Sequence, residues 1–362
     1  MKKFFFLISI FLAACHSGAE IFPDSRDPNI RVDGNANTNS NPLPSANTTP
    51  GAGAEEFKKG ATLVCWSSGC YQVAQVSAEL DYLQSVGVNW LAIVPTWYQD
   101  SLTSDVISEN SSRSPNEADL RAIVALARQR GFKILLKPHV DVLSGGWRGN
   151  INPLNLAAWQ GSYRNFILNF ARLAQELNVE VFSVGTELKR RSTDLSFWLN
   201  LILGVKDLYG GKLTYSANWD EYLLVGFWHL LDTIGIDFYN PLTSNNNATE
   251  AQIEAALRPI GAQIQAFSAA QHLPVLFTEI GYRSVDGANT RPYDTRLSGA
   301  VDLQEQADCY QAVLTVFQGA DWLKGIFWWR EDPRFLGGTA DDDYFFYGKP
   351  AATVLQRFWR GH

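Results

Sequence analysis

The sequence lacks the residue patterns that several large hydrolase classes require. Only five histidines occur in 362 residues, and no HExxH pair is present. This argues against a zinc hydrolase. No GxSxG elbow occurs, which argues against a serine esterase of the α/β-hydrolase type. An amidohydrolase barrel would need several histidines at strand ends, and here only His139 ends a candidate strand.

Cysteine is also scarce. After Cys15 the chain carries only Cys65, Cys70 and Cys309. Their scattered positions give no metal-ligand pattern, so we expect all three to be structural and predict no metal site. Cys65 and Cys70 flank a turn and could form a disulfide. Because the number is odd, at least one cysteine stays unpaired unless it pairs between chains.

The sequence has no surplus of positive charge. Its 30 Lys and Arg residues face 37 Asp and Glu residues, a formal net charge of -7. This balance argues against a nucleic-acid partner. The hydrophobic fraction of 46% is enough for a full-sized core. Aromatic residues, at 13%, are abundant; they are typical of proteins that stack rings on sugars, although core packing also uses them.

The N-terminus has the pattern of a targeting segment. Lys2 and Lys3 precede a short apolar run, which is too short to span a bilayer as a helix. The run ends in Leu-Ala-Ala-Cys15, which resembles the lipobox of bacterial lipoproteins. We therefore predict a lipoprotein signal peptide over 1–15, lipidation of Cys15, and export to the bacterial cell envelope with a lipid anchor in the membrane. His16 and Ser17 lack the Asp that marks inner-membrane retention, which favours the outer membrane; a plain signal peptide is the alternative.

Residues 16–56 are dominated by Asn, Pro, Thr, Ser, Gly and Ala. Such a composition offers almost nothing to bury, so this stretch is predicted to be a flexible, disordered tether. The remaining body, 57–362, is predicted to be one catalytic domain.

Strand-like and helix-like segments alternate through this body. The expected strands are 61–66, 89–95, 133–140, 179–185, 213–218, 233–239, 274–280 and 324–329. The expected helices are 73–86, 116–130, 158–177, 196–209, 222–230, 249–269, 303–318 and 350–359.

Eight such repeats predict the α/β class and a single (β/α)₈ TIM barrel, because apolar strands that alternate with helices form a parallel sheet covered by helices. An open doubly wound sheet is the rival architecture. It would normally carry a Gly-rich first turn, whereas the turn after Trp66 reads SSGC.

Two strands of this barrel end on a glutamate. The stretch VFSVGTEL at 181–188 places Glu187 after the fourth strand, and VLFTEIGY at 275–282 places Glu279 at the end of the seventh. In such a barrel the carboxyl ends of all strands meet at one mouth. Two carboxyl groups that face one cleft suit the cleavage of a glycosidic bond. The alternative is that each glutamate only forms a salt bridge at a strand end.

The other strand ends supply polar and aromatic side chains. Sugars have flat apolar faces ringed by hydroxyl groups, so aromatic rings beside charged and amide groups suit a sugar site. Individually, His139 could be a core histidine and Lys137 could pair with Asp141. The strand-end residues are Trp66, Lys137, His139, Asp141, Trp147, Arg148, Asn218, Trp219, Asp237, Tyr239, Tyr282, Arg283, Trp328, Trp329 and Arg330.

Several segments together resemble glycoside hydrolase family 113, endo-β-1,4-mannanases of the retaining clan A. These segments include KGATLVCW, LLKPHVDV followed by WRG, FSVGTEL, LTYSANW, IGIDFYNPL and LFTEIGYRS, and they extend over about 58–351. Many clan A families carry Asn before the acid/base, whereas Thr186 occupies that position here.

The resemblance implies that Glu187 is the general acid/base and Glu279 the nucleophile, and that no metal or organic cofactor is needed. It implies these substrate-binding residues: Lys137, His139, Asp141, Trp147, Arg148, Asn218, Trp219, Tyr239, Tyr282, Trp328 and Trp329; Trp66 is added to them as the aromatic residue that ends the first strand.

The expected function is hydrolysis of β-1,4-mannosidic linkages in mannan or mannooligosaccharides by double displacement. The expected partner is an oligo- or polysaccharide, and a monomer is the default. For this chemistry Glu279 needs hydrogen bonds that keep its pKa low, for which Tyr239, Tyr282 and Arg283 are candidates; Glu187 needs a raised pKa. Two alternatives stay open: a clan A enzyme for β-glucan, xylan or glucomannan, and an inactive oligosaccharide-binding lipoprotein.

Overall fold

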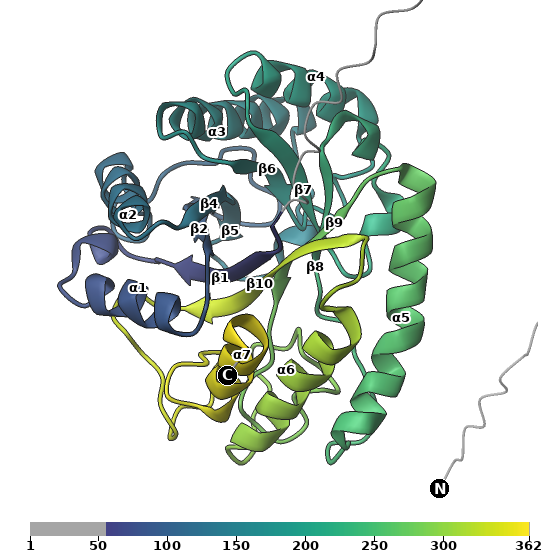
Figure 1. Ribbon diagram of the computed structural model, residues 1–362. Coiled ribbons are helices and arrows are strands. Elements are labelled where there is room, and N and C mark those ends of the chain that lie inside the picture. Colours follow the sequence, from purple (N-terminus) through teal and green to yellow (C-terminus); the bar gives the residue numbers. More distant parts are fainter. Residues whose placement is uncertain (1–55, 362) are drawn as a thin grey trace, which may run out of the picture. The chain divides into compact units, whose positions relative to one another are not determined.

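The computed structural model describes residues 56–361, which form a closed barrel of eight parallel strands surrounded by helices (Figure 1). The strands follow one another around the barrel in chain order, and β1 pairs with β10 to close it. They are β1 (Lys58–Val64), β2 (Trp90–Val94), β4 (Lys133–Leu136), β6 (Val181–Thr186), β7 (Lys212–Asn218), β8 (Thr233–Asp237), β9 (Val275–Ile280) and β10 (Leu323–Glu331).

The expectation of a (β/α)₈ barrel is confirmed. Seven α-helices cover the barrel in the described part of the chain. They are α1 (Val76–Ser85), α2 (Glu117–Gln129), α3 (Leu156–Glu176), α4 (Leu195–Lys206), α5 (Glu250–Gln271), α6 (Leu303–Phe317) and α7 (Pro350–Arg360).

The helix expected over 222–230 does not form. Two short 3₁₀ turns, Tyr222–Leu224 and Trp228–Leu230, occupy this stretch instead. Gly226 separates them, and the Trp228 indole donates a hydrogen bond to the Tyr222 carbonyl at 2.9 Å. The segment therefore closes on itself as a compact loop, so the apolar spacing reflected anchoring side chains rather than a helical face.

The strand expected over 133–140 is divided by Pro138, which has no N–H to donate to a sheet. β4 ends before it, and β5 (His139–Val142) begins after it. Pro95 divides the second strand in the same way, and β3 (Thr96–Gln99) follows. β3 and β5 pair as a separate parallel sheet with Thr96 opposite His139. This small sheet extends the barrel wall beyond β2 and β4.

The strand side chains alternate between two cores. Trp90, Ala92, Leu135, Val181 and Phe327 form one buried cluster, distinct from the large cluster that includes the helices. Their alternation with outward-packed neighbours places this cluster inside the barrel. The interior is therefore filled by side chains, and space for a ligand is left only at the ends of the strands.

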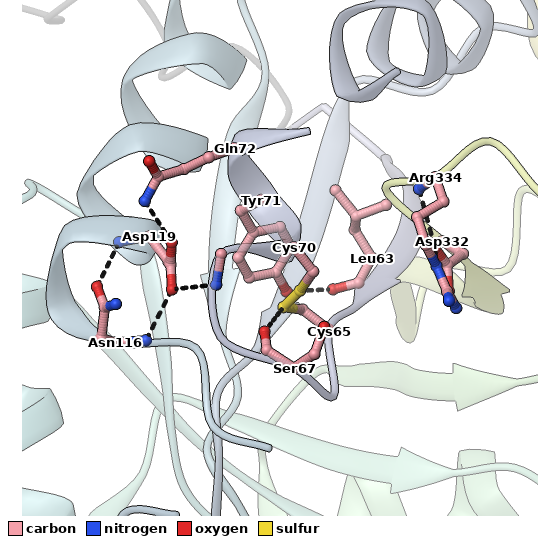
Figure 2. Close-up of a disulfide and its surroundings, with 11 residues drawn as sticks. Leu63, Cys65, Ser67, Cys70, Tyr71, Gln72, Asn116, Asp119, Asp332 and Arg334 are labelled. Carbon is pink, nitrogen blue, oxygen red and sulfur yellow. Dashed lines mark hydrogen bonds and ion pairs between the residues drawn. A yellow bond between two sulfur atoms is a disulfide. The ribbon is translucent and has the colours of Figure 1, made fainter. Parts of the chain in front are cut away.

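A disulfide joins Cys65 and Cys70 immediately after β1 (Figure 2). The pairing that the sequence left open is therefore Cys65 with Cys70, and Cys309 is free and buried. Beside it, the Asp119 carboxylate accepts hydrogen bonds from the Gly69 N–H at 3.0 Å and from the Gln72 amide. These contacts hold the loop after β1 against α2.

Three predictions from the sequence fall on residues that the structure does not describe. The signal peptide, the lipidation of Cys15 and the tether all lie within 1–56, of which only residue 56 is described. They stay predictions. In the described part of the chain, no helix combines the length and the apolar character that a membrane span requires.

A buried pair of carboxyl groups lies outside the mouth of the barrel. Glu79 on α1 is fully buried, and neither of its carboxyl oxygens has a hydrogen-bond partner among the described residues. Burial raises the pKa of Glu79 to about 8, and the Asp332 carboxylate adds to the rise. Glu331 at the end of β10 is also buried, and burial and the charge of Glu79 raise its pKa.

We expect this pair to make the fold less stable as the pH rises. Glu79 has an ordinary pKa of 4.5 but keeps its proton in the folded protein to about pH 8. Between these values the folded state binds more protons than the unfolded state, so the free energy of unfolding falls. The loss should be a few kcal/mol, since one pKa unit corresponds to about 1.4 kcal/mol.

Chemical denaturation of the Glu79→Gln variant at about pH 5 and about pH 9 measures this effect. The variant should lose clearly less stability across this window than the wild type, because the amide cannot ionise. Glu109→Gln, at an exposed carboxyl group, is the matched control and should behave as the wild type. Equal losses in wild type and Glu79→Gln would contradict the prediction.

Candidate active site

Glu187 and Glu279 both line a cavity of about 1050 Å³ at the carboxyl ends of the strands. Glu279 is the penultimate residue of β9, and Glu187 directly follows β6. Glu187 has a φ of 50°, in the left-handed region that costs a non-glycine residue free energy. Its N–H donates to the Ser216 carbonyl of β7 at 2.8 Å, which helps to hold this conformation.

Glu279 is held by side chains that follow two other barrel strands, β4 and β8. The Tyr239 hydroxyl donates to its Oε2 at 2.9 Å, and the Lys137 ammonium donates to its Oε1. The same ammonium contacts both carboxylate oxygens of Asp237, at 3.0 and 2.9 Å. His139 Nε2 lies 3.4 Å from Glu279 Oε1. These contacts fix the orientation of the Glu279 carboxylate.

The surroundings of Glu279 favour its ionised form. Burial opposes ionisation, but the Lys137 ammonium and the hydrogen bonds to the carboxylate outweigh it, and the pKa falls to about 2. Burial, helped by the positive charge of Arg148, lowers the pKa of His139 to about 4. His139 is therefore neutral at pH 7, and the positive charge beside Glu279 comes from Lys137.

Glu187 has a different environment. Arg148 Nη1 and the Trp147 indole N–H donate to its Oε2, at 2.9 and 3.1 Å. Burial raises the pKa of Glu187; Arg148 opposes the rise, and the negative charge of Glu279 adds to it. The Arg148 charge is shared, because its Nη2 also donates to Asp141 at 2.5 Å. The two carboxyl groups thus have pKa values shifted in opposite directions.

Most of the residues expected to bind sugar surround this cavity. Those that line it are Trp66, Asp141, Trp147, Arg148, Asn218, Trp219, Tyr239 and Trp329. Lys137 and His139 are buried beneath it and reach it through their contacts with Glu279. Trp66 lies within the loop that the Cys65–Cys70 disulfide closes, so a covalent bond restrains this cavity residue.

Tyr282 and Trp328 lie elsewhere, which corrects their expected place in the site. Both are fully buried, and neither lines the cavity. Trp328 stacks on Tyr310 of α6 with 3.7 Å between ring centroids. Adjacent strand residues point to opposite faces, so only one member of the Trp328–Trp329 pair can face the cavity.

Arg283 does not serve as a neighbour of Glu279 either. Its guanidinium donates to the Thr295 carbonyl at 3.2 Å and to the Leu297 carbonyl. It thereby holds the long loop after β9. The alternative considered for Lys137, a pair with Asp141, is not found; Lys137 pairs with Asp237 and Glu279.

Several residues that line the cavity were not singled out from the sequence. Tyr293, Thr295 and Arg296 come from the irregular loop between β9 and α6. The Tyr293 ring lies nearly parallel to Trp219, at 6.3 Å between centroids and 22° between planes. The remaining ones are Gly146, Asp220, Asp343 and Tyr344, whereas Arg330, which also lines the cavity, was among the strand-end residues.

Within residues 56–361 no group of His, Cys, Asp and Glu side chains could hold a metal ion. A second cavity, of about 1140 Å³, lies between α6 and α7 and is lined by neither catalytic candidate. The cavity at the strand ends is therefore the one in which the two carboxyl groups meet.

A (β/α)₈ barrel with two carboxyl groups facing one cleft is an arrangement typical of glycoside hydrolases. Residues 64–349 match the model of Glycoside Hydrolase Family 113. The chain belongs to this family.

Solved structures agree with this assignment. The GH113 β-mannanase AaManA from Alicyclobacillus acidocaldarius, in complex with ManMIm, is 26% identical over 85% of this chain and 98% of its own, with a TM-score of 0.79. A complex of a GH113 β-1,4-mannanase is 26% identical over 85% of this chain and 100% of its own, with a TM-score of 0.76. A comparison with curated protein sequences found no match.

A β-glucuronidase from Ruminococcus gnavus is 12% identical over 84% of this chain, with a TM-score of 0.54. This chain covers 49% of that protein. At this identity the likeness shows the fold alone.

Proposed function

We propose that this glycoside hydrolase cleaves β-1,4-mannosidic linkages in mannan or mannooligosaccharides by double displacement with retention. The observation that carries the proposal is the pair of carboxyl groups in one cavity with opposite pKa shifts, lowered for Glu279 and raised for Glu187. These shifts prepare Glu279 to attack as a carboxylate and Glu187 to donate a proton.

In the first step the Glu279 carboxylate attacks the anomeric carbon, and a bond forms between them. The bond from that carbon to the glycosidic oxygen breaks as Glu187 gives its proton to the oxygen, which leaves with the rest of the chain. Tyr239 and Lys137, which contact Glu279, hold the attacking carboxylate in one orientation.

In the second step a water molecule attacks the anomeric carbon and gives a proton to Glu187. Glu279 leaves as a carboxylate, which returns both groups to their initial state. The pKa of Glu187 is suited to this exchange. While Glu279 is esterified its negative charge is absent, and that charge is one of the causes of the raised pKa of Glu187. Glu187 is therefore a stronger acid in the intermediate and can act as a base.

The choice of mannan as substrate rests on the family and on the two GH113 β-mannanase structures. The aromatic rings of Trp66, Trp219, Tyr293 and Trp329 around the cavity suit the flat faces of a sugar chain. The cavity of about 1050 Å³ is large enough for an oligosaccharide.

Incubation with β-1,4-mannan, cello-oligosaccharides and xylan, with chromatography of the products, tests the substrate. We expect mannan to be cleaved, and proton NMR of the first product to show the β-anomer. Preferential cleavage of xylan or cello-oligosaccharides would replace mannan with another β-glycan. Binding of all three without any product would support the inactive oligosaccharide-binding protein instead.

A further inference from the structure

A third glutamate, Glu221, is buried behind the cavity wall. It lies between β7 and the first 3₁₀ turn and is fully excluded from solvent. Its Oε1 accepts a hydrogen bond from the Tyr215 hydroxyl at 2.6 Å, and its Oε2 accepts one from the Asn218 N–H at 2.9 Å. A buried carboxyl group is costly. Neither the mechanism above nor the family comparison gives this one a role.

The Tyr215 hydroxyl connects Glu221 to the acid/base segment. It donates to Glu221 and accepts from the Leu188 N–H at 2.8 Å. Leu188 is the residue directly after Glu187. The Glu187 N–H is itself bonded to the Ser216 carbonyl at 2.8 Å. β7 thus fixes the peptide groups on both sides of the Glu187 Cα, the residue with a φ of 50°.

Tyr215 is itself rigidly packed. Its ring contacts Trp198, Phe227 and Trp228, with centroid distances of 5.2, 5.3 and 6.1 Å. A ring held on several sides cannot move its hydroxyl to another partner. The orientation of the hydroxyl hydrogen is then set by its acceptor, Glu221, which leaves a lone pair for Leu188.

We propose that Glu221, acting through Tyr215, is a positioning residue for Glu187. Glu221 does not contact substrate in this scheme; it holds the backbone on which the acid/base is mounted. The inference rests on the proposed role of Glu187 as acid/base.

The charge of Glu221 also bears on Glu187. Burial raises the pKa of Glu221 to about 7, and the charge of Glu187 contributes to the rise. The titratable groups that face Glu221 are Tyr215 on its own strand, Tyr163 on α3 and Glu187 after β6. Because the repulsion is mutual, loss of the Glu221 charge should let Glu187 ionise at lower pH in the range above about pH 7, where Glu221 is ionised.

The test compares two substrates with Glu221→Gln and Tyr215→Phe. One is a mannooligosaccharide, whose leaving oxygen needs a proton; the other is a dinitrophenyl β-mannobioside, whose leaving group needs none. Because kcat/KM reports the step that forms the glycosyl-enzyme, a displaced acid should affect only the first substrate. We expect kcat/KM on the oligosaccharide to fall about 10- to 100-fold and that on the dinitrophenyl substrate to fall less than about threefold.

The second readout is the alkaline limb of the pH profile of kcat/KM on the oligosaccharide. In Glu221→Gln the part of this limb above about pH 7 should move to lower pH, because the charge that Glu221 carries there is gone. Tyr163→Phe is the matched control. This tyrosine belongs to the same aromatic cluster, and its hydroxyl donates to the Val184 carbonyl at 3.0 Å rather than to Glu221. It should change kcat/KM equally for the two substrates.

The proposal would be overturned if Glu221→Gln and Tyr215→Phe lost kcat/KM equally on both substrates, or lost none on either. Tyr215→Phe keeps the ring and its packing, so it gives the same readout should Glu221→Gln not yield folded protein. Glu187→Ala is measured alongside. If Glu187→Ala loses kcat/KM selectively on the oligosaccharide and the other two variants do not, only the proposed role of Glu221 is wrong. If Glu187→Ala shows no such selective loss, the proposed acid/base fails and the role of Glu221 fails with it.

Discussion

Replacing Glu279 with alanine is expected to lower the turnover of mannan by about 10⁴-fold or more, because no group remains to form the covalent intermediate. Lys137, His139 and Tyr239 converge on this carboxylate. Added azide can enter the space left by the carboxylate and attack the anomeric carbon directly. It should restore part of the activity and give the α-mannosyl azide, as NMR can show.

Glu331→Gln is a matched control for this variant. Glu331 is a fully buried carboxyl group on the neighbouring strand β10, but it does not line the cavity. It should keep turnover within a few-fold of the wild type. If Glu279→Ala kept more than a few per cent of wild-type turnover on mannan, while thermal unfolding showed that it was folded, Glu279 would not be the nucleophile.

Replacing Glu187 with alanine should separate two kinds of substrate. Cleavage of mannan should fall by about 10²- to 10⁴-fold, the usual contribution of general acid–base catalysis. Dinitrophenyl mannosides should still form the glycosyl-enzyme, with little change in kcat/KM, and the intermediate should accumulate because no base activates water. A burst of dinitrophenol in stopped-flow measurements would record this accumulation.

The pH profile gives an independent check on Glu187. Burial raises its pKa, so it keeps its proton to higher pH than an ordinary glutamate and loses it as the pH rises through that pKa. Wild-type kcat/KM on mannan should therefore fall on the alkaline side. Glu187→Ala acting on a dinitrophenyl mannoside should lack this fall. An unchanged alkaline limb in the variant would assign it to another group.

The barrel was predictable because its signal is local and repeated. Each strand is a short apolar run, and each helix has apolar residues at three- and four-residue spacing. Glu187 and Glu279 can be recognised in the sequence as the glutamates that follow or end two of these runs. The failures were also local. The apolar spacing over 222–230 could not distinguish a helix from a loop whose Trp228 folds back onto Tyr222.

The partners of the catalytic candidates were harder to predict. Neighbours in sequence were expected to serve Glu279, yet Tyr282 lies in the core and Arg283 holds a loop. The groups that do contact Glu279 come from other strands, and only Tyr239 among the expected neighbours is one of them. Which strand ends face each other depends on barrel register, and spacing along one chain does not encode it.

Tyr293 illustrates a second limit. It comes from a loop without periodic structure, and its place opposite Trp219 depends on distant anchors. The Glu305 carboxylate accepts from the Gly287 and Asn289 N–H groups of this loop, and the Tyr344 hydroxyl donates to the Pro292 carbonyl. Contacts of this kind become visible only when the chain is folded.

The position of Lys137 between two carboxylates has a consequence for the whole reaction cycle. In a double displacement Glu279 becomes an ester and loses its charge, which would leave a lone ammonium in the low-dielectric floor of the barrel. Asp237 prevents this, because it holds the same ammonium. Burial, and after it the charge of Glu279, raises the pKa of Asp237. Esterification removes the negative charge of Glu279, so the pKa of Asp237 falls. Asp237 therefore ionises more readily when it becomes the sole counter-ion of Lys137.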